Sequence, residues 1–157
     1  MVFAGLPFHF LILHAAVVFT PLAGTAAIAF AVLPRWRYLT RWPTAALTLI
    51  ALVSVWLSRI SGQAYLSDNP ELAPAVQTHM SRGVTLSLLM ILFTVVVAVA
   101  VWGLGGRSGF ASGSGAVQTR VAVFDKVLPA ALIVTSLLVL VWVFLTGDAG
   151  ARAVWER

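Results

Sequence analysis

The sequence has 157 residues, of which 61% are hydrophobic and 10% are charged, and its formal net charge is +5. Soluble domains are roughly 45–50% apolar and about 25% charged, so this composition excludes an ordinary soluble domain. The chain contains no cysteine, which excludes a disulfide, a thiolate-bound iron–sulfur cluster, a covalently attached c-type haem and a cysteine nucleophile.

The apolar residues are concentrated in long runs. A helix needs about 20 mostly apolar residues to cross the hydrocarbon core of a bilayer. We predict membrane spans over residues 9–33, 44–60, 83–104 and 127–146. The sequence therefore predicts an all-α integral membrane protein, a four-helix bundle that forms a single transmembrane domain over residues 1–157. Because the basic residues flank the spans and form no single patch, nucleic acid is not an expected partner.

The first run opens with "PFHFLILHAAVVF", which contains His9 and His14. Polar residues inside spans usually face the interior of a bundle or a wet cavity. The two histidines are five residues apart and would point about 140° away from each other, so a regular helix cannot chelate one ion with both. For His14, a hydrogen bond across helices and a ligand or proton-handling role both remain open. Further along, Ala23, Ala27 and Ala31 favour close contact with a neighbouring helix.

Two connections between spans carry most of the positive charge. The first, "PRWRYLTRWP", is short, basic and aromatic, as expected of a cytoplasmic loop. The other, residues 105–125, has the Gly/Ser composition of a flexible linker on the same side. Together with the adjacent Lys126 they hold Arg35, Arg37, Arg41, Arg107 and Arg120, against Arg59, Arg82, Arg152 and Arg157 on the other side. We therefore predict a multi-pass protein of the bacterial cytoplasmic (inner) membrane with both termini extracytoplasmic.

The connection between the second and third spans then also faces outward. Pro70 after Asp68 and Asn69 is typical of a helix start. Leu72, Val76 and Met80 recur at helical spacing, which predicts a short amphipathic helix along the membrane surface.

With this topology, the three histidines, Arg59 and Asp148 share the outer ends of the spans, where four packed helices bring them within reach of one another. An unpaired charge in lipid costs up to about 3 kcal/mol. We therefore predict a salt bridge between Arg59 and Asp148. The alternatives are that Arg59 extends to the interface, that Asp148 caps the "TGDAGA" turn, and that His9 and His79 are interfacial residues on polar surfaces.

The stretches "GLPFHFLILHAAVVFTPLAG", "HMSRG" and "TGDAGARAVW" resemble the bacterial four-span membrane family called domain of unknown function 2231, in its actinobacterial form. The matching positions are His9, His14, His79, Gly83, Gly147, Asp148, Gly150, Ala151 and Trp155. Phe10 stands where many members have proline. The family has no established activity, but fusions of some relatives to Rieske-type iron–sulfur domains imply a role near electron transfer.

Three functional hypotheses follow. The first is a redox module with a b-type haem held between helices by His14 and His79, with His9 as a further candidate ligand. The second is an outward-facing copper or zinc site made of His9, His14, His79 and Asp148. The third is a non-catalytic accessory or scaffold subunit, which binds the lipid bilayer and a respiratory or other membrane complex, or other copies of itself.

The sequence contains no phosphate loop, no HExxH and no Ser/His/Asp order typical of a hydrolase. A transporter is disfavoured because the spans show neither broken helices nor an inverted repeat. We therefore expect a small, non-enzymatic membrane protein whose His/Arg/Asp cluster supports electron transfer or assembly.

Overall fold

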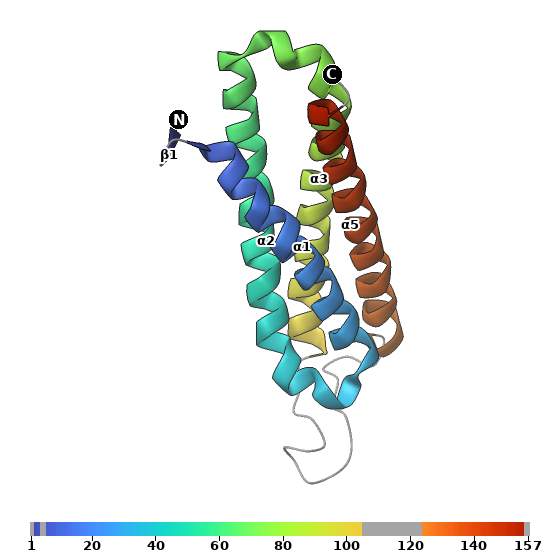
Figure 1. Ribbon diagram of the computed structural model, residues 1–157. Coiled ribbons are helices and arrows are strands. Elements are labelled where there is room, and N and C mark those ends of the chain that lie inside the picture. The colour runs from blue at the N-terminus through green and yellow to red at the C-terminus, as the bar shows by residue number, and fades with distance from the viewer. Residues whose placement is uncertain (1, 4–5, 105–123, 156–157) are drawn as a thin grey trace.

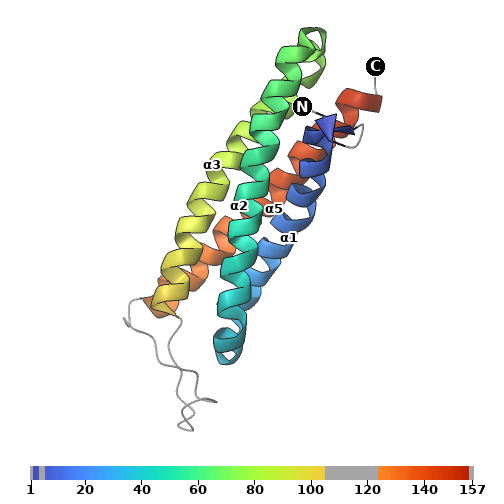
Figure 2. The same cartoon turned by 90° about the vertical axis from the view of Figure 1, so that its left-hand side faces the viewer.

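The computed structural model describes residues 2–3, 6–104 and 124–155, which contain four long helices packed side by side (Figures 1 and 2). The helices are α1 (Phe8–Val32), α2 (Arg37–Asp68), α3 (Ala73–Gly103) and α5 (Phe124–Trp155). All four are long and apolar enough to cross a membrane. The predicted all-helical, multi-pass class is therefore confirmed at this level.

Short elements complete the described chain. The two-residue strands β1 (Val2–Phe3) and β2 (Leu6–Pro7) pair antiparallel before α1. Single 3-10 turns, η1 (Pro34–Trp36) and η2 (Pro70–Leu72), precede α2 and α3. The expected flexible linker over residues 105–125 lies almost wholly outside the described residues.

Each helix packs mainly against two others: α1 and α3 each contact both α2 and α5. In Figure 1, the first half of α1 leans toward α2, and its second half lies beside α5. The start of α1, the α2–α3 connection and the end of α5 lie at one end of the molecule. We call this end, where His9, Arg59, His79 and Asp148 are found, the polar end.

Two boundaries differ from the sequence prediction. The amphipathic helix expected between the second and third spans does not stand alone. Its residues from position 73 onward form the first turns of α3, because after Pro74 no proline interrupts the helix before Gly103. The basic connection before the second span is also largely helical, since α2 already begins at Arg37.

Arg37 explains why the first connection is tight. Its side chain is buried and donates from Nε to the Phe30 carbonyl and from Nη2 to the Ala31 carbonyl, each over 3.1 Å. The last carbonyls of a helix have no partner within the helix. Arg37 therefore caps the end of α1 with a charge-assisted contact and fixes where α2 starts.

The core between the helices combines a few large side chains with small ones. Phe30, Met90 and Phe93 are fully buried. The alanines at 23, 27 and 31 are buried as well, which confirms the predicted close-contact face of α1. A Cβ built on Gly24 would lie 3.1 Å from Cγ of Leu140. At this position α1 and α5 are in tight contact because Gly24 has no side chain.

We expect Gly24→Leu to force α1 and α5 apart, since overpacking typically costs about 1–3 kcal/mol. At this chain length, each kcal/mol lowers the midpoint of thermal unfolding by about 2–4 °C. The matched control is Gly83→Leu, because no atom lies within 4 Å of a Cβ built at Gly83. Circular dichroism on heating in mild detergent measures both variants. Equal midpoints would contradict the close α1–α5 contact.

Candidate functional site

His9 joins α1 to α2 at the polar end. Its Nδ1 lies 3.0 Å from the Ser58 carbonyl and 3.2 Å from Oγ of Ser61. Because a carbonyl can only accept, Nδ1 carries the proton. The ring lies against Gly62, where an added Cβ would be 3.0 Å from Cε1 of His9. The imidazole thus contacts the backbone of α2 directly.

His79 joins α3 to α5 in the same way. Its Nδ1 donates to the Thr146 carbonyl over 2.9 Å. A Cβ on Gly150 would lie 2.9 Å from that nitrogen, so any side chain at position 150 must displace the ring. Both imidazoles therefore keep Nε2 as their acceptor nitrogen when neutral.

The two contacts share one sequence pattern on the accepting helix, Ser58-x-x-x-Gly62 and Thr146-x-x-x-Gly150. In an α-helix, the carbonyl of residue i accepts from the N–H of residue i+4. A glycine at i+4 leaves that carbonyl uncovered on one side, so that an imidazole can donate a second hydrogen bond to it. We call this arrangement the imidazole–glycine contact.

Arg59 joins α2 to α3. Its Nη1 donates to Oγ of Ser87 over 3.0 Å, and its guanidinium lies 5.1 Å from the centre of the Trp56 ring. Ser87 is fully buried. The hydroxyl and the aromatic ring therefore provide Arg59 with a polar and a cation–π partner next to the membrane interior.

Asp148 has other cationic partners than the sequence predicted. It lies 3.1 Å from Nε of Arg152 and 3.9 Å from Nη1 of Arg82. Arg82 also donates to the Leu145 carbonyl over 2.7 Å. The structure does not bring Arg59 to Asp148, because α5 packs against α1 and α3 while Arg59 points from α2 to α3. The ion pair thus joins α3, not α2, to α5.

His9 and His79 interact electrostatically at the polar end, whereas His14 is exposed on α1. His9 precedes the membrane-spanning residues Ile12–Val32. Burial lowers the pKa of His9, the hydrogen bond to the Ser58 carbonyl opposes this, and the charge of nearby His79 lowers the pKa further. Burial and the charge of His79 therefore both favour the neutral form of the His9 imidazole.

The predicted copper or zinc set is not assembled. Within residues 2–3, 6–104 and 124–155, no three or more histidine, cysteine, aspartate or glutamate side chains are placed to hold a metal ion. The Nδ1 atom of His9 is bonded to α2 and that of His79 to α5. The two rings are therefore held by different helices.

The C-terminal motif residues divide between two surfaces of α5. Gly150 contacts His79. Gly147 and Ala151 line a groove that faces α1, together with Asp148. Trp155 is 84% exposed, which suits an aromatic residue at a membrane interface.

Comparisons with protein-family models, with curated proteins and with solved structures found no match to this chain. The resemblance to the domain of unknown function 2231 therefore stays a prediction.

The residues that receive the imidazoles, namely Ser58, Gly62 and Thr146, were not predicted as site residues. A signal was present, because a Ser/Thr-x-x-x-Gly pattern occurs toward the polar end of each helix that follows a histidine-bearing helix. The pattern can be interpreted only when the neighbouring helices are known, and the sequence alone does not define them.

We expect Gly147→Ala, which has open space around its Cβ, to stabilise α5 by up to about 1 kcal/mol through helix propensity. Gly150→Ala should lack this gain, because the methyl group displaces His79 and breaks its hydrogen bond, worth about 0.5–1.5 kcal/mol. In a His79→Ala background, Gly150→Ala should recover the gain.

Thermal unfolding of the four combinations of changes at positions 79 and 150 gives the coupling energy, which we expect to be about 1 kcal/mol. Strict additivity would show that the imidazole–glycine contact does not hold α3 to α5.

Proposed function

We propose that this protein is a non-catalytic accessory subunit of a larger membrane complex. In this proposal it forms a four-helix bundle in the bacterial cytoplasmic membrane, and its polar end faces outward as a docking platform. The alternatives from sequence are a redox module and a metal-binding protein. Both require the histidines to bind a haem or a metal ion, whereas in this proposal the histidines hold helices together.

The proposal is supported by the contacts that polar side chains make at the polar end. His9 contacts the backbone of α2, and His79 contacts the backbone of α5. Arg59 bonds α3. These groups hold neighbouring helices to one another, as expected of residues that fix the shape of a surface. A fixed surface favours binding because little conformational freedom is lost on association.

The outward orientation is supported by charge. Arg35, Arg37 and Arg41 lie around the α1–α2 connection, at the opposite end from the histidines. Loops rich in arginine and lysine favour the cytoplasmic side of a membrane. The polar end would then lie outside the cytoplasm, together with both termini.

The test is gentle extraction of the tagged protein from its native membranes, followed by native electrophoresis and mass spectrometry. We expect the 16.7 kDa chain to migrate in a larger complex of fixed composition. The double variant His9→Ala/His79→Ala should lose most of this complex while still inserting into the membrane. His14→Ala is the control, because it removes an exposed imidazole from the same helix.

Migration as an isolated chain would contradict an accessory role, and a complex built only from this chain would indicate a homo-oligomer instead. Equal recovery of the complex from the double variant and the control would show that the imidazole contacts do not shape the docking surface.

A b-type haem module is the second candidate, favoured by the Nδ1 atoms of His9 and His79, each of which donates to a backbone carbonyl. A backbone carbonyl that accepts from Nδ1 is the usual means of aiming Nε2 at a metal. The donors therefore suit haem iron. The space suits it less, because each ring is pressed against a glycine of the next helix.

Absorption spectra of the protein, purified after expression with ample haem, decide between the two candidates. If haem is bound, reduction with dithionite should give a sharp α-band that is lost in His9→Ala and in His79→Ala but kept in His14→Ala. A spectrum without this band would remove the haem hypothesis and leave the accessory role.

A further inference from the structure

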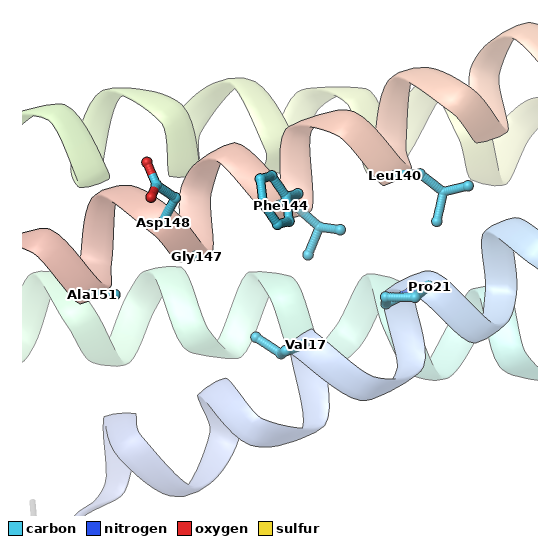
Figure 3. Close-up of a pocket in the computed structure, with 8 residues that line it drawn as sticks. Val17, Pro21, Leu140, Phe144, Gly147, Asp148 and Ala151 are labelled. Carbon is cyan, nitrogen blue, oxygen red and sulfur yellow. The ribbon is translucent and has the colours of Figure 1, made fainter.

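A groove of about 460 Å³ lies between α1 and α5 in the half of the molecule toward the polar end. Figure 3 shows Val17 and Pro21 on α1, opposite Phe144 on α5. The volume falls within the range of about 300–1,000 Å³ typical of small-molecule sites. Its walls are almost entirely apolar, and the Phe144 side chain is 74% exposed.

The dimensions of the groove match one hydrocarbon chain. Its wall on α5 runs from Leu140 to Ala151, which at 1.5 Å per residue is about 16 Å. One leaflet contributes about half of the roughly 30 Å hydrocarbon core. The groove therefore has the length of one extended acyl chain within one leaflet.

Charge at the mouth of the groove selects the headgroup. Asp148 lines the groove and is shared by the guanidinium groups of Arg82 and Arg152. Two positive charges thus surround one negative charge, and the side chain of Arg152 is 63% exposed. Guanidinium groups bind phosphate through paired hydrogen bonds. The charge at this end of the groove favours a phospholipid whose headgroup carries a net negative charge.

We propose that the groove binds one anionic phospholipid, with an acyl chain between α1 and α5 and the phosphate beside Arg152. His14 precedes Val17 by about one turn and Pro21 by about two, so it lies on the same face of α1 as the groove wall. An imidazole at this position is at the level where the headgroup meets the hydrocarbon. This binding site does not depend on the accessory role proposed above.

Gly147→Leu tests the acyl-chain site. A Cβ at position 147 has no atom within 4 Å, so the leucine fills the groove without a clash inside the protein. Gly83→Leu is the matched control, with equally open space at a helical glycine outside the groove. Native mass spectrometry in mild detergent, after addition of phosphatidylglycerol, counts the lipids retained per chain. We expect one lipid on the wild type and on the control, and a roughly fivefold or greater loss of occupancy in Gly147→Leu.

Arg152→Gln tests the headgroup. The wild type should retain phosphatidylglycerol over phosphatidylcholine by about fivefold, as expected for one arginine near an anionic headgroup, and Arg152→Gln should remove the preference. Full occupancy in Gly147→Leu would overturn the proposal, as would equal retention of the two lipids by the wild type. A wild-type dimer that Gly147→Leu dissociates would also overturn it, because a second copy of the chain would then occupy the groove.

Discussion

The arrangement of the helices depends on an imidazole that lies against a glycine of the neighbouring helix. His9 and Gly62 make this contact between α1 and α2, and His79 and Gly150 make it between α3 and α5. Helices in lipid lack the hydrophobic driving force that packs helices in water, so close backbone approach and hydrogen bonds must supply specificity. An average interhelical hydrogen bond in a membrane protein is worth only about 0.6 kcal/mol. The glycine matters at least as much, because it sets the distance and the register at which the helices can meet.

The repetition of this contact divides the molecule into two similar hairpins. In each hairpin, a histidine at the start of the first helix donates to a Ser or Thr carbonyl close to the end of the second helix. Arg59 then joins the hairpins by reaching from α2 to Ser87 of α3. The remaining seam, between α1 and α5, is held where Gly24 meets Leu140. Of these contacts, the hydrogen bonds lie at the polar end, and the Gly24 contact lies nearer the middle of the helices.

The sequence predicted the helices well because crossing a bilayer demands length and apolarity, and both can be counted directly. The alanine face of α1 was predictable for the same reason, since its spacing is local. The partners of Arg59 and Asp148 were not predictable in this way. Both lie at the same end of the molecule, as expected, but Arg82 lies on the helix beside α5 and Arg59 does not. Arg37 was likewise counted as a loop charge, although its side chain caps α1 from a buried position.

The same contacts explain why a groove opens between α1 and α5 and nearer the polar end. The bond from His9 to Ser58 holds the start of α1 against α2, and α1 leans that way in Figure 1. A helix that starts against α2 at His9 and meets α5 at Gly24 lies farther from α5 at its start than at Gly24. His79 meanwhile keeps the end of α5 against α3. The groove is therefore a geometric consequence of the two imidazole–glycine contacts, and its walls are mostly apolar.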